Sequence, residues 1–361
     1  MKFIHCADLH LDSKIETIPP EKSKIRRDET VRTFERLCEY AEKEKVSAVI
    51  IAGDMFDTKR ITLKTRGRVV SAIKNAPDVD FLYLSGNHDD DNFISSEKED
   101  GALPQNLKPF SSEWSGFSYG NVNIAGIVVN ENNSAYIYDR LRLPESGVNI
   151  AVLHGQVAGY KSEDKAELIS IPRLKDKNID YLALGHIHSY SEGKIDERGV
   201  YVYCGCPEGR GFDETGAKGF VLITEENGKL THEFVPFASR LLLEYSFDIS
   251  EYSDFYEAQN VLLSLLKNEF SPNSLIKVIL TGEHSADFEP DISGLNSRLN
   301  ELFFFGKTYD KTRLKVSAED YSTDKSVRGE FVREVLASDL SEEDKAKVLM
   351  LGLGALKGER V

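Results

Sequence analysis

The sequence predicts an α/β protein with a large first part and a smaller second part. The run VSAVIIA, residues 46–52, is continuously apolar and rich in β-branched residues, as in a strand buried on both faces of a sheet. Similar runs alternate with segments of helical periodicity, which favours an α/β sheet core. The pattern changes near residue 240, and a length of 361 residues at ~150 residues per domain fits about two domains.

The expected elements of the first part follow one another in this alternation. Helices are predicted over 28–44 and 65–75, and residues 90–120 are polar and read as a loop or short-helix region. The predicted strands are short apolar runs that end at polar or glycine-containing turns: 2–7, 46–52, 81–84, 122–129, 149–153, 181–184, 200–204 and 219–224.

The second part reads as a β-α-β-α-β unit followed by two helices. Its strands are predicted over 241–247, 275–281 and 312–316, its helices over 255–270 and 292–304, and the last two helices over 327–337 and 342–356. We therefore expect three domains, with boundaries at residues 1–238, 239–320 and 321–361.

Composition excludes several classes of protein. A net charge of −15 argues against a protein that coats nucleic acid or an anionic membrane through bulk charge. The sequence has neither an apolar run long enough to span a membrane nor a signal peptide, and its four cysteines do not form a disulfide scaffold. A cytoplasmic protein without a membrane partner is expected.

One basic segment departs from this acidity. Between Lys59 and Lys74 there are six basic residues and no acidic one. The segment is either a solvated helix face or a surface that contacts phosphate groups or a partner.

Residues that bind metals follow several of the predicted strands directly. They are carboxylate, amide and imidazole side chains that come at strand ends, where α/β sheets place their ligands. In chain order they are Asp8, His10, Asp54, Asn87, His88, His154, His186 and His188.

Three carboxylate or amide oxygens and four imidazoles of this set can bind a pair of divalent metal ions, with Asp54 bridging them. Two such ions activate water and suit in-line attack at phosphorus. Mixed nitrogen and oxygen ligands favour manganese, iron or zinc over magnesium or calcium. A lone Asp-x-His or a lone histidine such as His154 is more often a packing feature, but the five elements in this order indicate a dinuclear site.

The ordered motifs resemble those of calcineurin-like metallophosphoesterases. These motifs are the Asp8/His10 pair, Gly53-Asp54, Gly86-Asn87-His88-Asp89, His154 and Gly185-His186-Ile187-His188. More narrowly, residues 7–13 (ADLHLDS), 53–58 (GDMFDT) and 203–207 (YCGCP) resemble DNA-repair exonucleases of the SbcD type, and residues 207–220 are similar to the YhaO-like branch of that group.

The resemblance implies a four-layer αββα sandwich with a small α+β cap domain after residue 239. It also implies two metal positions: Asp8, His10, Asp54 and His188 would hold one ion, and Asp54, Asn87, His154 and His186 the other. His88 would be the general acid and Asp89 would orient it. Some family members have a histidine three residues after the bridging aspartate, where this chain has Asp57.

The resulting hypothesis is a manganese-dependent DNA exonuclease or endonuclease of DNA repair. The resemblance implies a coiled-coil ATPase partner of the SbcC type, which the last helix would dock unless it packs on the cap, and a homodimer. Two rival hypotheses remain: a phosphatase or phosphodiesterase of small molecules or proteins, and a DNA-end-binding scaffold. Candidate DNA contacts are the basic residues Lys59, Arg60, Lys64, Arg66, Lys311 and Arg313.

Overall fold

The computed structural model describes residues 1–57, 61–89, 92–99, 101, 103–158, 168–285, 288, 290–315 and 321–357. These residues form two compact units, Met1–Leu241 and Leu242–Val361. Each unit has its own hydrophobic core. No described helix is long and apolar enough to cross a membrane.

The first unit contains two six-stranded sheets. In the first sheet the order is β14-β13-β1-β2-β3-β4, with β1 to β4 parallel and β13 and β14 antiparallel to their neighbours. Its strands are β1 (Lys2–Cys6), β2 (Ala48–Ala52), β3 (Asp80–Leu84), β4 (Leu107–Pro109), β13 (Gly219–Glu226) and β14 (Lys229–Pro236).

The second sheet has the order β11-β12-β10-β7-β6-β5, with four parallel inner strands and an antiparallel strand at each edge. Its strands are β5 (Ser115–Tyr119), β6 (Val122–Gly126), β7 (Val148–His154), β10 (Tyr181–Gly185), β11 (Ser191–Lys194) and β12 (Val200–Tyr203). The short strands β8 (Gln156–Val157) and β9 (Leu168–Ile169) pair separately.

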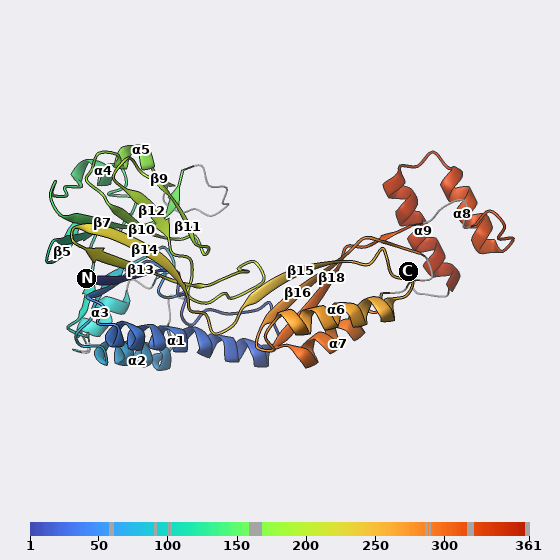
Figure 1. The fold of residues 1–361 in the computed structure, drawn as a ribbon, viewed down its shortest axis with the longest axis horizontal. Helices are drawn as coiled ribbons and strands as arrows, with labels where there is room; N and C mark the ends of the chain where they lie inside the picture. The colour runs from blue at the N-terminus through green and yellow to red at the C-terminus, as the bar shows by residue number, and fades with distance from the viewer. Residues whose placement is uncertain are drawn as a thin grey trace. The chain divides into compact units, whose positions relative to one another are not determined.

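Three hydrophobic clusters separate four layers in this unit. One lies between the sheets and includes Ile50 of the first and Val152 of the second. A second lies under α1 (Pro20–Lys43) and α2 (Leu63–Lys74), and a third under α4 (Ile137–Arg140) and α5 (Ile171–Leu174). Figure 1 shows these helix pairs on opposite sides of the sheets. The predicted αββα sandwich is thus confirmed.

The structure differs from the prediction in this unit at one helix start and in several additional elements. Helix α1 begins at Pro20 rather than near residue 28, because a proline in the first helical turn fixes φ and loses no hydrogen bond. The region expected to be irregular contains α3 (Asn92–Glu99), β4 and β5. Strand β14 is an additional hairpin strand that follows a turn with positive φ at Asn227 and Gly228.

The second unit is a three-stranded parallel sheet with two helices packed on it. The sheet contains β15 (Leu242–Asp248), β16 (Leu275–Thr281) and β18 (Phe305–Asp310), and the helices are α6 (Phe255–Glu269) and α7 (Ile292–Leu302). A separate small cluster joins α8 (Val327–Ala337) to α9 (Glu342–Lys357).

The third strand of this sheet lies earlier in the chain than predicted. Helix α7 ends at Leu302, so that Phe305 starts the strand β18 that pairs with β16. Within the described part of the predicted strand, residues 312–315, Arg313–Leu314 form β19, which pairs with β17 (Glu283–His284) instead, and residue 316 lies outside the described residues. The aromatic residues 303–305 continue the apolar pattern of the helix, so the sequence pattern does not mark where the helix ends and the strand begins.

Candidate metal centre

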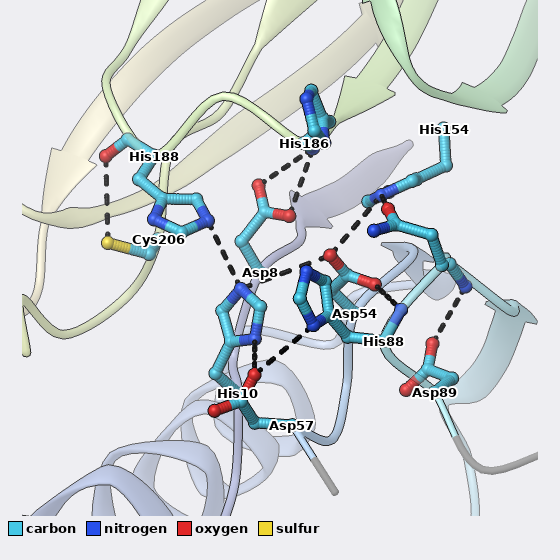
Figure 2. A network of polar contacts seen from close by, with 12 residues as sticks. Asp8, His10, Asp54, Asp57, His88, Asp89, His154, His186, His188 and Cys206 are labelled. Carbon is cyan, nitrogen blue, oxygen red and sulfur yellow. Dashed lines mark hydrogen bonds and ion pairs between the residues drawn. The ribbon is translucent and has the colours of Figure 1, made fainter. Parts of the chain in front are cut away.

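The loops after β1 and β2 bring three expected ligands together. These neighbouring strands continue their pairing beyond the sheet, because the N–H of Asp8 donates to Gly53 O at 3.0 Å and that of His10 to Asp54 O at 3.0 Å. Asp8, His10 and Asp54 are all buried. The carboxyl ends of the two strands therefore hold these side chains at one place (Figure 2).

The second sheet contributes the histidines. His154 ends β7, while His186 and His188 follow the neighbouring strand β10. The backbone N–H of His186 donates to the Asp8 carboxylate, at 2.9 and 3.0 Å from its two oxygens. The centre thus lies between the two sheets and draws ligands from both.

Four of these residues have a left-handed backbone. Their φ angles are +52° at Asp8, +44° at His10, +53° at Asp54 and +100° at His186. Such angles are uncommon outside glycine, and Asp and His tolerate them better than most residues. Backbone strain of this kind concentrates at functional sites.

Two glycines leave the room that the side chains of the centre need. A Cβ on Gly53, which has φ of +97°, would collide with the His154 ring. A Cβ on Gly86 would collide with the carboxylate and the backbone nitrogen of Asp54. Both positions therefore require glycine for close packing around Asp54 and His154.

A first group of possible ligands comprises Asp8, His10 and His188, whose ligand atoms lie within 4.8 Å of one another. The Nε2 atoms of His10 and His188 are 3.1 Å apart. The Nδ1–H of His188 donates to Glu214 Oε1 at 2.7 Å, since a carboxylate only accepts. In the neutral ring, Nε2 of His188 then carries a lone pair directed at His10, an arrangement that fits a cation between them.

A second group comprises Asp8, Asp54 and His154. The Nδ1–H of His154 donates to Ala52 O at 2.9 Å, while its Nε2 lies 3.0 Å from Asn87 Oδ1 and 3.3 Å from Asp54 Oδ2. Burial disfavours the charge of Asp54, but the hydrogen bond and charge of His154 hold the pKa of that carboxyl well below its usual range. Once His154 gives up its Nε2 proton, a carboxylate, an amide oxygen and an imidazole nitrogen would converge here, a donor set that suits a divalent cation.

His186 is placed differently from the other expected ligands. Among the described residues, two groups of acidic, cysteine and imidazole side chains meet the 4.8 Å spacing, and neither contains His186. Its ring centroid lies 5.7 Å from that of His154, and the residue lines the cavity at the centre.

His88 and Asp89 point to different partners. The His88 N–H donates to Asp54 Oδ1 at 3.0 Å, and its half-exposed imidazole has Nδ1 3.4 Å from Asp57 Oδ1. The buried Asp89 carboxylate accepts hydrogen bonds from the N–H groups of Phe56 and Gly86, each at 2.8 Å, and burial raises its pKa to about 7. Asp89 therefore connects the loop after β2 to the loop after β3 through these hydrogen bonds. The carboxylate that lies beside the His88 imidazole is that of Asp57, not that of Asp89.

Residues 207–214 add two side chains that the motifs did not single out. The Arg210 guanidinium donates to Glu214 Oε1, with Nη2 at 2.9 Å, and lies 3.7 Å from Asp57 Oδ2. Both residues line the centre's cavity of about 520 Å³, together with Asp57, His88 and His188. The segment was noted for its resemblance to the YhaO-like branch, but nothing in its spacing gave these side chains a role.

The candidate DNA-binding residues fall into three groups. Lys59 and Arg60 lie outside the described residues. Arg66 forms an ion pair with the buried Glu97, so its charge is balanced within the unit, whereas Lys64 is exposed on α2. Lys311 and Arg313 are exposed in the second unit.

A four-layer α/β sandwich with clustered acidic and imidazole groups at its strand ends defines a metal-dependent hydrolase. The model of the calcineurin-like phosphoesterase family matches residues 1–190, and the chain belongs to that family.

Several known proteins are similar to this chain. YhaO of Bacillus subtilis (strain 168), described as an uncharacterized metallophosphoesterase, is 28% identical over 302 residues, which cover 78% of this chain and 72% of YhaO. The DNA double-strand break repair protein Mre11 of Methanosarcina acetivorans is 26% identical over 301 residues, and the match covers 78% of this chain but 46% of that protein. The solved structure of TT1561 of Thermus thermophilus has a TM-score of 0.44 at 10% identity, covering 64% of this chain and 98% of that one.

Proposed function

We propose that this chain is a metal-dependent DNA nuclease of DNA repair that hydrolyses phosphodiester bonds. The observation that carries the proposal is the convergence of Asp8, Asp54, His10, His154 and His188 at the ends of four strands from two sheets. The relation to Mre11, a DNA double-strand break repair protein, supports DNA as the substrate.

In this proposal Asp8, His10, Asp54 and His188 hold one divalent ion, and Asp54, Asn87, His154 and His186 hold the other. When bound, two such ions would activate water and neutralise charge on the phosphate. Mn²⁺ is the proposed metal, with Fe²⁺ or Zn²⁺ as alternatives, because imidazole and carboxylate ligands are mixed.

His88 is the proposed general acid. Its backbone is anchored to Asp54, while its imidazole is 48% exposed and lines the cavity, where it can reach a leaving oxygen. Asp57 lies 3.4 Å from Nδ1 and would hold the ring with Nε2 toward the substrate. Protonation of the leaving oxygen by such a group typically accelerates hydrolysis by ~10²–10⁴-fold.

The proposal extends to the rest of the chain. Residues 1–238 would form the nuclease domain, 239–320 a cap whose Lys311 and Arg313 contact DNA, and 321–361 helices that dock a coiled-coil ATPase of the SbcC type. A homodimer in the cytoplasm is the proposed state. Within the first unit, Lys64 remains a candidate DNA contact.

The test is a nuclease assay with matched substrates. Metal-free protein is incubated with Mn²⁺ and with labelled single-stranded or double-stranded DNA, and in parallel with small phosphodiesters, phosphomonoesters and phosphopeptides. Cleavage of DNA that depends on Mn²⁺ and is lost in Asp54→Asn is expected. DNA left intact while small or protein-bound phosphates are hydrolysed would contradict the proposal and establish the alternative, a phosphatase or phosphodiesterase. Substrate binding without any turnover would favour a scaffold.

A further inference from the structure

A glutamate from outside the metal-binding motifs contacts a candidate ligand on the side away from the metal position. Glu214 lies in the segment between β12 and β13 and is 5% exposed. Its Oε1 accepts a hydrogen bond from His188 Nδ1–H at 2.7 Å, while Nε2 of the same ring faces His10. Glu214 therefore fixes which nitrogen of His188 carries the proton and which offers its lone pair.

The other oxygen of Glu214 is held as well. Oε2 accepts the backbone N–H of Arg210 at 2.7 Å, and the Arg210 side chain donates to Oε1 through Nε at 3.1 Å and Nη2 at 2.9 Å. The carboxylate thus has partners on both oxygens. Burial opposes its charge, but the hydrogen bond from His188 and the Arg210 guanidinium hold the pKa of Glu214 well below its usual range.

The segment that carries Glu214 is itself anchored. The Lys218 amino group donates to His188 O at 2.6 Å, so the segment contacts the backbone of His188 as well as its ring. At the other end, the fully buried Arg26 of α1 donates to Glu208 Oε2 at 2.9 Å and to Gly209 O at 2.7 Å. Contacts on both sides of Glu214 therefore keep its position defined before any metal binds.

The neighbouring candidate ligand His10 also has a carboxylate beside its Nδ1, but this contact is less well aligned. Its Nδ1 lies 3.2 Å from Asp57 Oδ1, without the alignment of a regular hydrogen bond. Arg210 reaches Asp57 at 3.7 Å as well as Glu214. The two imidazoles that face each other are thus backed by two carboxylates that share one arginine, and Glu214 makes the better-defined contact.

We propose that Glu214 is a positioning residue for the metal position at His10 and His188, and that Arg210 holds Glu214 in place. The carboxylate keeps the His188 ring in the tautomer and orientation that binds a cation, and its negative charge increases the basicity of Nε2. Outer carboxylates of this kind typically contribute 10–100-fold to metal affinity. The inference rests on the metal centre in the proposed function and adds residues that set its affinity.

The test measures metal binding directly, without turnover. Metal-free wild-type protein, Glu214→Gln and Glu214→Ala are titrated with Mn²⁺, and bound ions are followed by calorimetry and by the electron paramagnetic resonance signal of free Mn²⁺. We expect two sites in the wild type and one weakened site in each variant. Glutamine, which can still accept the hydrogen bond, should weaken it by ~10-fold, and alanine by up to ~100-fold.

A second glutamate–histidine pair of the same unit supplies the matched control. Glu192 Oε2 lies 2.7 Å from His232 Nε2, and neither residue lines the cavity at the metal centre or belongs to its candidate ligand groups, so Glu192→Gln and Glu192→Ala should bind Mn²⁺ as the wild type does. Circular dichroism checks that each metal-free variant is folded, and the nearly isosteric glutamine variant carries the test if the alanine variant is unstable.

The outcomes separate the two proposals. A wild type that binds two ions and a folded Glu214→Gln that binds both with unchanged affinity would overturn the role of Glu214 only. A wild type that binds no divalent ion would overturn the metal centre itself, and this inference with it.

Discussion

Individual residues around Asp54 are constrained by space as well as by charge. Gly86 lies against both the carboxylate and the backbone of Asp54, and Asp54 itself has a left-handed backbone. Strained positions of this type cost roughly 1–3 kcal/mol each and persist because their surroundings hold them. One added methyl group at Gly86 should therefore displace the Asp54 carboxylate, the proposed bridge between the two metal positions.

Replacing Gly86 with alanine tests this constraint. The added Cβ would overlap Asp54, so we expect Gly86→Ala to remain folded but to lose Mn²⁺ binding and activity by at least about 10-fold, in the range of losses seen when ligand orientation is disturbed. Gly67→Ala is the control, since a Cβ there meets nothing within 4 Å. Equal activity of both variants in the Mn²⁺-dependent assay would show that the packing at Gly86 is not tight.

The proposed general acid can be separated from the ligands by one substitution. His88→Ala should lower kcat by ~10²–10⁴-fold, because it removes a proton donor, while both Mn²⁺ affinities stay unchanged. Single-turnover cleavage and a Mn²⁺ titration of the same preparation give the two numbers. A loss of metal binding in this variant would instead make His88 a ligand.

The candidate ligands could be singled out from the sequence because each follows a buried strand. The side chains that support them could not. Asp57 contacts His10 and His88, which follow the strands on either side of β2 in the same sheet. Glu214 contacts His188 of the other sheet. These partners are distant in sequence and meet only in the folded unit. For the same reason the sequence left the role of the basic segment Lys59–Lys74 open, since Arg66 forms an ion pair with Glu97, an acid on another helix.

At the scale of elements, α1 is tied to the segment before β13 by buried charge. Arg26 on α1 is fully buried and pairs with Glu208, which is also buried and accepts a hydrogen bond from Thr33 Oγ1 at 2.7 Å. A buried carboxylate that loses its partner is costly. This ion pair therefore joins the helix layer to the segment that carries Glu214.

Arg26→Met should lower the free energy of unfolding by about 3–5 kcal/mol, because it leaves Glu208 buried without its cation. Urea unfolding followed by circular dichroism measures the change. Arg32→Met on the same helix removes a largely exposed pair with Asp28 and should cost no more than about 1 kcal/mol. Similar losses in the two variants would contradict the importance of burial.

Central elements were easier to predict than edge elements. The parallel strands β2, β3, β7 and β10 are mostly apolar and buried on both faces, and each overlaps its predicted range. The edge strands β11 and β14 alternate exposed and half-buried residues, so they lack that signal. Strand β18 was missed because its start continues the apolar pattern of the preceding helix.

At the scale of the whole molecule, the metal centre should link ion binding to folding. An ion that binds only the native state at 100 times its dissociation constant adds ~2.7 kcal/mol of stability. We expect Mn²⁺ to raise the melting temperature of the transition of the first unit and excess chelator to reverse the rise. Differential scanning calorimetry checks this, and Asp54→Asn, which lacks the bridging charge, should show no such shift.

The net charge of −15 bears on DNA binding by the whole chain. Two exposed cations, Lys311 and Arg313, are candidate contacts in the second unit, and few contacts give weak, salt-sensitive binding. Fluorescence anisotropy with duplex DNA should show weak binding whose affinity falls by roughly 10-fold between 50 mM and 200 mM salt, as two phosphate contacts would give. Nanomolar binding by this chain alone at physiological salt would contradict the prediction and would reduce the need for a partner.

The topology of the first sheet has a consequence for biosynthesis. Strand β1, which leads into Asp8 and His10, lies between β2 and β13, yet β13 begins only at Gly219 and its partner β14 ends at Pro236. A nascent chain of 190 residues already contains all the expected ligands but lacks these two strands and Glu214. At translation rates of ~5–20 residues per second, the missing strands follow roughly 2–9 s later. The centre is therefore completed late, and a chain terminated at this point would contain the expected ligands without the two strands that complete the first sheet beside β1.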